Sequence, residues 1–450
     1  MNINDTIAAI ATPVGEGGIG VIRISGSNAL AVAVKNFKPA GKDVKAIKSH
    51  RLYLGTLLSG EGTIDEVCLV YMKAPRSYTR QDCVELSCHG SPAVLRHALR
   101  VIMENGARMA EPGEFTKRAF LNGRINLSQA EGVIDLIKAR SEGAATAALH
   151  LMEGGLSSRI EAAKQKLLHI LSHLEASIDF PDEELETATD AQLIKLLDES
   201  IHKVDSLVRS YESGKFLKNS MKIAIIGKTN VGKSSLLNAL LEEERAIVTE
   251  HPGTTRDLIR GEIEIAGIPV EFVDTAGLNK TADEVESIGI ERTLKMAQEA
   301  DLVIALFDGS RKWDEEDSKV LETIGELKNL IILINKSDIE QKLAWPDSSR
   351  KTHPISVNMR TGFEHIEEAV KKTAGTFKPG VEPLITRARH LGIFKRISED
   401  LHRARQELSI GREIAAAEIW DAVEEIKRFT GESYTEEVLS KIFDEFCIGK

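Results

Sequence analysis

The sequence predicts a multidomain protein that combines mixed α/β parts with an all-helical part. A chain of 450 residues is too long for one hydrophobic core, so two or three domains are expected. Short apolar runs separated by Gly and Pro fill the first part of the chain, whereas apolar residues at helical spacing dominate two later parts. Between these helical parts lie four apolar runs that are typical of parallel strands buried on both faces. The simplest architecture is a helical domain interrupted by an inserted α/β domain.

The domain boundaries follow from where these patterns change. In chain order we expect a mixed α/β domain at 1–120, a first helical part at 121–216, the inserted α/β domain at 217–375 and a second helical part at 376–450. Helical spacing is clear in two sets of apolar residues: Leu167, Leu171, Leu174 and Ile178, and Ile393, Ile397, Leu401 and Leu408. Near the C-terminus, Thr435 is expected to cap the last short helix.

Composition limits the class of protein and its location. The hydrophobic share is 42%, and no apolar run approaches the roughly 18 residues that suggest a membrane span. Because the N-terminus has no secretory pattern, a cytoplasmic location without a membrane partner is expected. A formal net charge of -11 argues against nonspecific coating of nucleic acid, although a local basic face stays open. The spacing of Cys68, Cys83, Cys88 and Cys447 indicates reduced thiols.

A glycine-rich loop predicts phosphate binding in the inserted domain. The apolar run 223–226 is followed by Gly227-Lys228-Thr229-Asn230-Val231-Gly232-Lys233-Ser234, and a helical pattern continues from there. In this context the loop amides and the N-terminus of the helix converge on phosphate oxygens. Lys233 is expected to reach the outer phosphates, and the hydroxyl of Ser234 can ligate Mg²⁺. A glycine-rich turn without a ligand is the alternative.

Two further strand ends complete the predicted nucleotide site. Asp274-Thr275-Ala276-Gly277 follows the run 270–273 and would place a carboxylate near the metal and a glycine amide near the γ-phosphate. Asn335-Lys336-Ser337-Asp338 follows the run 330–334, and Asp338 could accept the two donor hydrogens of guanine that adenine lacks. An exposed Lys/Asp turn is the alternative. Because open α/β sheets bind ligands at the carboxyl ends of strands, the combination predicts a Ras-like P-loop GTPase domain.

Hydrolysis of GTP requires a group that orients water. Ras-like enzymes use a glutamine after the DxxG motif, but Leu278 stands at that position. Glu286 is our candidate for positioning the water; a solvated acidic helix start is the alternative. A monovalent cation beside the β- and γ-phosphates could be held by Asn230 and by loop oxygens from about Thr249 to Thr254, because hard cations favour oxygen ligands.

The full set of GTPase motifs resembles the translation-factor-related GTPases. By that resemblance, Ser356-Val357-Asn358 occupies the last guanine-contacting loop, although the usual Ser-Ala-Lys/Arg is altered, and Thr255 would complete the Mg²⁺ shell. The expected GTP contacts are Asn230, Val231, Gly232, Lys233, Ser234, Ser235, Thr249, Glu250, His251, Pro252, Gly253, Thr254, Thr255, Asp274, Thr275, Ala276, Gly277, Asn335, Lys336, Ser337, Asp338, Ser356, Val357 and Asn358.

The whole chain resembles the MnmE family of tRNA-modifying GTPases, also called TrmE or ThdF. The marks outside the GTPase motifs are Asp5-Thr6-Ile7, Gly20-Val21-Ile22-Arg23-Ile24-Ser25-Gly26, Ser77-Tyr78-Thr79, Glu85, His89-Gly90, the run 115–123 and the terminal Cys447-Ile448-Gly449-Lys450. The resemblance implies a homodimer that works with the flavoprotein MnmG (GidA), in a heterotetramer or larger complex, on carbon 5 of the wobble uridine of certain tRNAs. The added group is of the carboxymethylaminomethyl or aminomethyl type.

The resemblance also implies cofactors and residue roles. An N-terminal domain would bind 5-formyltetrahydrofolate or a related one-carbon tetrahydrofolate and would dimerise, with folate contacts at the matching Arg23, Glu85, Arg124 and Lys450. Arg124 stands where some relatives have lysine, which keeps the charge and changes the donor geometry. The K⁺ positions, linked to dimerisation of the GTPase domains, match Asn230, Thr249, His251 and Thr254, and the catalytic glutamate matches Glu286.

Two alternatives stay open at this point. The thiolate of Cys447 could attack carbon 6 of the uridine, but a lone cysteine near the chain end is more often incidental. A GTP-regulated ribosome-assembly or interaction switch, without modification chemistry, is the alternative for the protein as a whole. Binding of the folate derivative by the N-terminal domain would distinguish the enzyme from such a switch.

Overall fold

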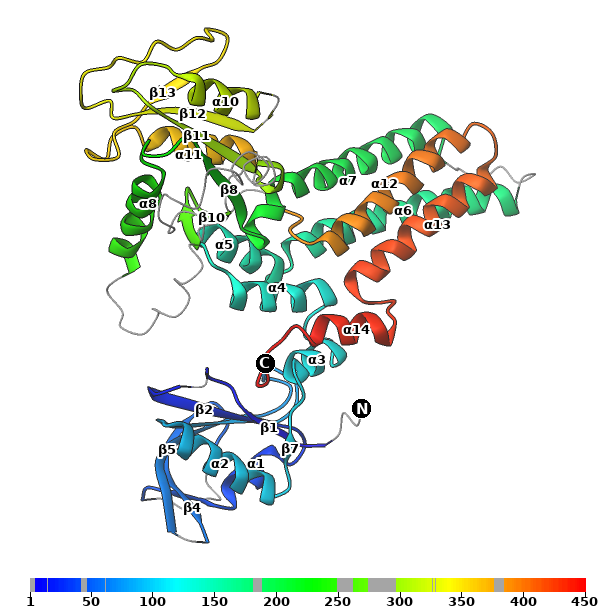
Figure 1. Ribbon diagram of the computed structural model, residues 1–450. Helices are drawn as coiled ribbons and strands as arrows, with labels where there is room; N and C mark the ends of the chain where they lie inside the picture. Colours follow the sequence, from blue (N-terminus) through cyan, green and yellow to red (C-terminus); the bar gives the residue numbers. More distant parts are fainter. Residues whose placement is uncertain are drawn as a thin grey trace. The chain divides into compact units, whose positions relative to one another are not determined.

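The computed structural model describes residues 5–13, 15–41, 47–60, 62–180, 188–248, 262–273, 297–325, 327, 329–375 and 384–450. The chain divides into two compact units (Figure 1). Unit one comprises Met1–Ile134, Leu151–Ser157 and Ile426–Lys450, and unit two comprises Asp135–His150 and Ser158–Glu425. The C-terminal segment Ile426–Lys450 therefore belongs with the N-terminal segment Met1–Ile134, although the two are far apart in the sequence.

Unit one contains a seven-stranded sheet with the strand order β3-β4-β5-β6-β2-β1-β7. Its strands are β1 (Ile7–Ile10), β2 (Gly17–Ser25), β3 (Phe37–Pro39), β4 (Leu52–Ser59), β5 (Gly62–Met72), β6 (Cys83–Gly90) and β7 (Arg108–Met109). Neighbouring strands are antiparallel except for the parallel pair β1 and β7. Helices α1 (Ala29–Val34) and α2 (Pro92–Glu104) pack on the face that carries the buried Ile22 and Leu86. Since side chains alternate along a strand, the residues between them lie on the other face.

Unit one also contains three helices that pack on one another. They are α3 (Glu114–Leu121), α4 (Leu127–Lys138), most of which belongs to this unit, and α14 (Glu436–Phe443). Phe120, Leu127 and Phe443 form part of a buried apolar cluster that connects these three helices. The predicted cap is confirmed, because the side chain of Thr435 accepts a hydrogen bond from the backbone N–H of Val438 over 3.3 Å.

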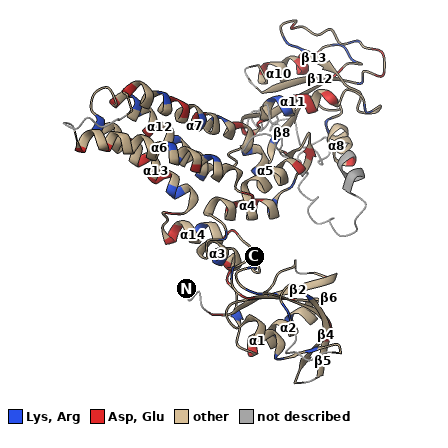
Figure 2. Cartoon of the chain, turned by 180° about the vertical axis from the view of Figure 1, so that it is seen from behind, with Lys and Arg blue, Asp and Glu red and all other residues tan. Residues whose placement is uncertain are grey.

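Unit two has a helical part. Its main helices are α7 (Asp190–Lys218), α12 (Ala388–Glu407) and most of α5 (Glu142–Met152), α6 (Gly155–Asp179) and α13 (Arg412–Thr430). The predicted helical spacing is confirmed: Leu167, Leu171 and Leu174 are buried on α6. Helices α7 and α12 lie side by side (Figures 1 and 2), joined by the hydrogen bond from Ser398 to Asp205. Figure 2 also shows acidic and basic residues interspersed along α7, α12 and α13.

Unit two also has a six-stranded sheet with the order β13-β12-β11-β8-β10-β9. The strands are β8 (Met221–Ile226), β9 (Glu262–Ile265), β10 (Ile268–Phe272), β11 (Leu302–Asp308), β12 (Leu330–Asn335) and β13 (Thr352–Pro354), with α8 (Lys233–Val248), α10 (Glu315–Thr323) and α11 (Glu364–Ala374). All neighbours are parallel except β9 and β10. Ile223 and Ile225 belong to one buried cluster and Ala224 and Ile226 to another, so the sheet is covered on both faces as predicted.

The four apolar runs predicted as strands correspond to β8, β10, β11 and β12. The carboxyl ends of these parallel strands lie at one edge of the sheet, which is where the sequence places its phosphate and guanine motifs. Within the described part of the chain, no helix combines the length and the apolar character that a membrane span requires.

Candidate functional site

The loop between β8 and α8 has the backbone geometry of a phosphate cradle. Gly232 has a φ of 104°, and a Cβ on it would lie 2.5 Å from Nδ2 of Asn335, so this position requires glycine. Asn230 also has a positive φ, of 63°, a conformation that asparagine tolerates better than most residues. Helix α8 begins at Lys233, so its first-turn amides and the positive end of its dipole lie at this loop.

Lys233 lies inside the loop and contacts its backbone. Its ammonium donates hydrogen bonds to the carbonyl oxygens of Gly227 and Lys228, each over 2.7 Å. Burial lowers the pKa of Lys233, because a cation is less stable away from water. A phosphate is a stronger partner for this ammonium than the neutral carbonyls, because it adds the attraction between opposite charges to the hydrogen bond.

Asn335 links the phosphate loop to the guanine side of the site. Its side-chain amide donates to the carbonyl oxygen of Val231 over 2.8 Å, and its side-chain oxygen accepts from the N–H of Val357 over 3.2 Å. The residue is buried at the end of β12, so both halves of its amide are satisfied by backbone. The loop that carries Val357 is thereby held against the phosphate loop.

Asp338 and Ser356, which the sequence predicts to lie at the guanine end of the site, are hydrogen-bonded to each other. The hydroxyl of Ser356 donates to Oδ1 of Asp338 over 2.6 Å and accepts from the N–H of Met359 over 3.1 Å. The backbone of Ser356 pairs with that of Thr361 in both directions, which fixes the hydroxyl. The carboxylate of Asp338 is therefore held in a defined orientation at the mouth of the site.

A cavity of about 630 Å³ lies between these groups. The predicted site residues that line it are Asn230, Gly232, Ser235, Asn335, Lys336, Asp338, Val357 and Asn358. The predicted Val231 and Ser356 are buried beside it, and Ser234 stands in the first turn of α8. Ser337 donates its backbone N–H to Ile355 and so anchors the turn. The structure thus brings the phosphate and guanine motifs together around one space of suitable size for a nucleotide.

The remaining predicted residues of this site lie outside the described residues. They are Thr249, Glu250, His251, Pro252, Gly253, Thr254, Thr255, Asp274, Thr275, Ala276, Gly277 and Glu286.

Two charged contacts at this site were missed by sequence reasoning. Asp308 ends β11 and accepts a hydrogen bond from Nζ of Lys336 over 2.7 Å. Arg360, from the loop after β13, pairs with Glu242 of α8 over 2.7 Å, and both line the cavity. Asp308 could have been found, because it follows a buried apolar run at the same sheet edge as Asn335. The pairing of Arg360 has no comparable sequence signal.

A second cluster of predicted residues lies on the sheet of unit one. Arg23 on β2 faces Glu85 on β6 in the strand register, and their side chains form an ion pair of 2.8 Å. Nη1 of Arg23 also donates to the carbonyl oxygen of Gly449 over 3.4 Å. Gly449 has a φ of 97°, and a Cβ there would lie 2.3 Å from the carbonyl oxygen of Ile10. The C-terminal segment therefore packs closely against the strand that neighbours β2.

Tyr78 connects the predicted folate residues. The guanidinium carbon of Arg23 lies 5.6 Å from the centre of its ring, and that of Arg124 lies 5.0 Å from it. Arg124 also donates to the carbonyl oxygen of Ser77 over 2.7 Å. Lys450 accepts at its carbonyl oxygen from the N–H of Phe115, which fixes the chain end. All four predicted residues, Arg23, Glu85, Arg124 and Lys450, thus belong to one region of unit one.

The cysteines differ in their surroundings. Cys447 is exposed, whereas burial raises the pKa of Cys83 and of Cys88 to about 12. Of the four thiols, Cys447 is the most exposed, and Cys68 is half-buried.

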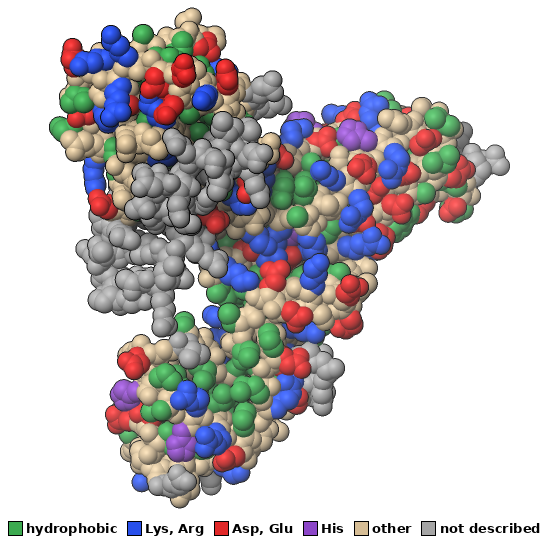
Figure 3. All heavy atoms as spheres, in the orientation of Figure 1, with side chains coloured by type: hydrophobic (Ala, Val, Ile, Leu, Met, Phe, Trp, Pro, Cys, Tyr) green, Lys and Arg blue, Asp and Glu red, His purple; other side chains and the backbone are tan. Residues whose placement is uncertain are grey.

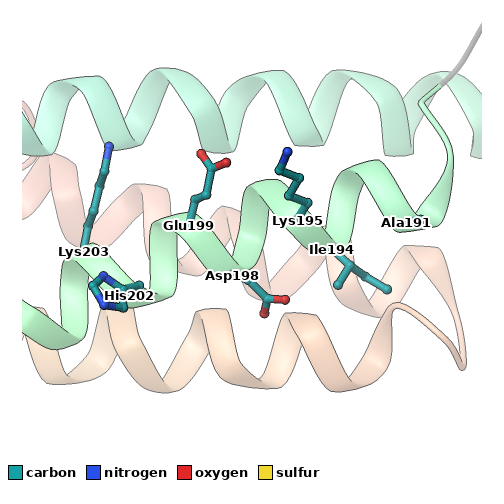
Figure 4. A pocket seen from close by; sticks show the side chains of 7 residues that line it. All are labelled: Ala191, Ile194, Lys195, Asp198, Glu199, His202 and Lys203. Carbon is teal, nitrogen blue, oxygen red and sulfur yellow. The ribbon is translucent and has the colours of Figure 1, made fainter.

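A different cavity, of about 610 Å³, lies along α7 (Figure 4). Figure 4 shows Lys195, Glu199 and Lys203 on one side of the helix and Asp198 and His202 on the other. Glu199 pairs with Lys166 and Asp198 with Arg405. Figure 3 shows the same mixture of charges over the visible face of the helical part. These exposed pairs are typical of a solvated helix surface rather than of a binding site.

Comparisons with known proteins cover nearly the whole chain. A family profile described as "GTP-binding protein TrmE N-terminus" matches residues 6–124, and one described as "MnmE helical domain" matches residues 127–447. Three similar proteins are each named "tRNA modification GTPase MnmE". The protein from Acetivibrio thermocellus is 42% identical over 99% of both chains, that from Moorella thermoacetica is 43% identical over 100% of both, and that from Aquifex aeolicus is 42% identical over 100% of both.

Proposed function

The chain belongs to the MnmE family of tRNA modification GTPases, and from that premise we propose that it couples GTP hydrolysis to modification of carbon 5 of the wobble uridine, U34, in certain tRNAs. One observation carries the proposal: the phosphate loop and the Asn335–Asp338 turn meet around a single cavity in a chain whose family likeness covers its whole length. The proposed domains remain 1–120 for folate, 121–216 and 376–450 for the helical domain, and 217–375 for the GTPase domain.

Asp338 would select the base. Its carboxylate lines the cavity, and the hydrogen bond from Ser356 leaves it oriented to accept the N1 and exocyclic amino hydrogens of guanine. Adenine offers an acceptor at N1 and no amino group at carbon 2, so it would leave this carboxylate without the two donors that guanine provides. That mismatch supports discrimination by hydrogen bonding rather than by shape.

Lys233, Ser234 and Thr255 would bind the phosphates together with Mg²⁺. The donor set fits, because Ser234 lies in the first turn of α8, directly after Lys233 in the sequence, and hydroxyl oxygens are ligands that Mg²⁺ accepts. The ion, when bound, neutralises phosphate charge. Lys233 exchanges its loop carbonyls for phosphate oxygens, and the α8 amides supply further donors.

Glu286 would position the attacking water, and K⁺ would be held by Asn230, the backbone of His251, Thr249 and Thr254. Asn230 fits this role, since its side chain carries an oxygen and the residue lines the cavity at the phosphate loop. The cation supplies positive charge beside the phosphates that other GTPases obtain from an arginine. We expect hydrolysis to be linked to dimerisation of the GTPase domains.

The folate derivative would bind beside Arg23, Glu85, Arg124 and Lys450. The two guanidinium groups suit the carboxylates of a folate, and the ring of Tyr78, which lies near both, offers an aromatic surface. The pterin ring carries N–H donors, for which the Glu85 carboxylate is a suitable acceptor. Bound folate supplies the one-carbon unit.

The exposed face of the sheet in unit one supports a homodimer. The strand register pairs Leu52 with Val70, Val70 with Glu85, and Glu85 with Arg23, so the exposed Leu52 shares a face with the folate residues. Leu52 is 66% exposed and Leu54, two residues on, is 49% exposed. Covering this face with a second copy would bury apolar surface beside the folate site.

The proposed partners are tRNA and the flavoprotein MnmG, in a heterotetramer or larger complex in the cytoplasm. The added group is of the carboxymethylaminomethyl or aminomethyl type. The exposed Cys447 could attack carbon 6 of the uridine and activate carbon 5. A Cys447→Ser variant with normal GTP hydrolysis and no tRNA modification would support that role, whereas full modification would exclude it.

The test of the proposed function compares GTP hydrolysis in KCl and NaCl at equal ionic strength. We expect faster hydrolysis in KCl, loss of hydrolysis in Glu286→Ala, and little change in Glu284→Ala, a control from the same acidic segment. A deletion strain should lack the modified uridine, and the wild-type chain should restore it. Hydrolysis that is independent of K⁺, no binding of 5-formyltetrahydrofolate and unchanged tRNA would instead indicate a GTP-regulated switch.

A further inference from the structure

Asp308 is a buried carboxylate at the carboxyl end of β11, and its side chain is 2% exposed. Its Oδ1 accepts hydrogen bonds from the backbone N–H of Ser310 over 2.9 Å and from the Ser310 hydroxyl over 2.6 Å. Its Oδ2 accepts from Nζ of Lys336 over 2.7 Å. The two oxygens therefore have different partners. Oδ1 accepts hydrogen bonds that close a local turn, and Oδ2 accepts one from Lys336 in the loop 335–338, which we call the guanine loop.

Asp308 cannot readily exchange Lys336 for another cation. Burial disfavours the charged form of Asp308, but the hydrogen bonds from Lys336 and Ser310 outweigh this effect and hold its pKa below the ordinary value. A buried carboxylate that lost its cation would remain uncompensated, which is costly. Arg311 is a weaker substitute, since its Nε lies 3.5 Å away and its side chain is 60% exposed.

This ion pair determines where the rest of the Lys336 side chain lies. The backbone of Lys336 has a φ of 64°, and its ammonium is held at Asp308, so the side chain is fixed at both ends. Between these ends, Lys336 lines the cavity and is 33% exposed. A lysine stem of methylene groups offers apolar contact along its length, which matches the apolar face of a flat purine ring.

We propose that Asp308 is a positioning residue for guanine nucleotides, which holds the stem of Lys336 as one wall of the base pocket. The inference rests on the proposed function only in that the cavity binds a guanine nucleotide. Because Lys336 contacts the base and not the phosphates, Asp308 contributes equally to the binding of GDP and GTP. It leaves the hydrolytic step unchanged once the site is saturated.

The test measures affinity for fluorescent GDP, together with kcat and KM for GTP, in the full-length protein. Asp308→Asn keeps the shape and removes the charge, and we expect the Kd for GDP and the KM for GTP to rise by a similar factor, on the order of 10- to 100-fold, with kcat unchanged. Lys336→Met keeps an apolar side chain of similar length but removes the ammonium that pairs with Asp308. We expect this variant to raise the Kd for GDP and the KM for GTP by a similar factor. In the double variant we expect no further loss, because Asp308 acts through Lys336.

Asp347→Asn is a matched control. Asp347 accepts from the N–H and the hydroxyl of Ser349 in the same type of turn, and it pairs with Arg350 over 3.0 Å, but it does not line the cavity. Removing the charge of Asp347 should therefore leave the Kd for GDP unchanged.

The outcomes separate this inference from the proposed function. A wild-type protein that fails to bind GDP would remove the proposed function itself. A wild-type protein that binds GDP, with an equally tight Asp308→Asn variant, would overturn the inference. Losses that add in the double variant would also overturn it. If Asp308→Asn does not fold, the Lys336→Met variant provides the test. An unchanged Kd for GDP in Lys336→Met would then contradict the proposed role of Asp308.

Discussion

The side-chain amide of Asn335 donates a hydrogen bond of 2.8 Å to the backbone carbonyl of Val231. These residues are 104 positions apart in the sequence, and the contact joins the guanine loop to the phosphate loop. The bond is buried, so water cannot replace it readily. The proposed recognition of the base and of the phosphates therefore depends on one hydrogen-bonded unit.

Asn335→Asp should disrupt this unit without changing its shape. The new carboxylate would face the Val231 carbonyl without a hydrogen to donate, so two acceptors would oppose each other. We expect GDP binding to weaken at least tenfold and the GTPase domain to lose about 1–3 kcal/mol of unfolding free energy, measured by nucleotide titration and by urea unfolding followed by tryptophan fluorescence. Asn105→Asp is the control, because Asn105 also donates to a carbonyl, that of Val32, but in unit one. Equal GDP affinity in both variants would contradict this account.

Asp338→Asn should change the base that the protein prefers. Xanthine carries a carbonyl where guanine carries its amino group, so the amide of asparagine can donate to xanthine where the carboxylate accepts from guanine. Ser356 can still donate to the asparagine oxygen, which keeps the side chain in place. We expect competition assays to show weaker GDP and stronger xanthosine diphosphate binding. A variant that loses both nucleotides equally would show that Asp338 serves the fold and not the base.

Acid should weaken unit one through a buried network of charges. Glu114 and Arg118 are fully buried, and Arg108 and Asp5 complete the network. Burial opposes ionisation of Glu114 and Asp5, but the arginines outweigh it and lower the pKa of both below their ordinary values of 4.5 and 3.8. The stabilisation is therefore present above these values and is lost as pH falls through the lower folded-state pKa values.

Glu114→Gln should remove part of this stabilisation at neutral pH, about 1–3 kcal/mol, because Arg118 and Arg108 lose the buried carboxylate that they share and keep their pairing with Asp5. Hydrogen exchange of peptides from β1 and α3 should become faster at pH 7 and should change less between pH 7 and pH 3.5 than in the wild type. The exposed Glu111→Gln is the control. The same exchange pattern in both variants would mean that the network does not stabilise the unit.

Thiol labelling should separate the cysteines. Because burial raises the pKa of Cys83 and Cys88 to about 12, these thiols should not react with a maleimide at pH 7.5 in the folded protein. The exposed Cys447 should react first and the half-buried Cys68 more slowly. Peptide mass spectrometry over time measures the order, and labelling in urea provides the reference. Early modification of Cys83 would show that the described packing of β6 is wrong.

Much of the candidate nucleotide site could be predicted from the sequence, because its polar residues follow the ends of strands. Apolar runs indicated β8, β10, β11 and β12, and the residues after two of them, at the phosphate loop and at Asn335, meet at one sheet edge. This works because parallel strands buried on both faces are continuous apolar runs, and their carboxyl ends lie together.

Contacts between distant side chains could not be predicted in the same way. The pairing of Asp308 with Lys336 depends on the alignment of β11 with β12, and that of Arg360 with Glu242 on how the loop after β13 faces α8. Arg23 and Glu85 were singled out by family resemblance, but their ion pair follows from the register of β2 and β6. Register depends on the packing of the whole sheet, which no local pattern contains.

The most direct test of the central claim is a titration of the purified full-length protein with GDP and with ADP, repeated for Lys233→Ala. The account predicts that GDP binds, that ADP does not compete with it, and that Lys233→Ala weakens GDP binding strongly because the phosphates lose their buried cation. Equal affinity for GDP and ADP, or full GDP affinity without Lys233, would contradict it.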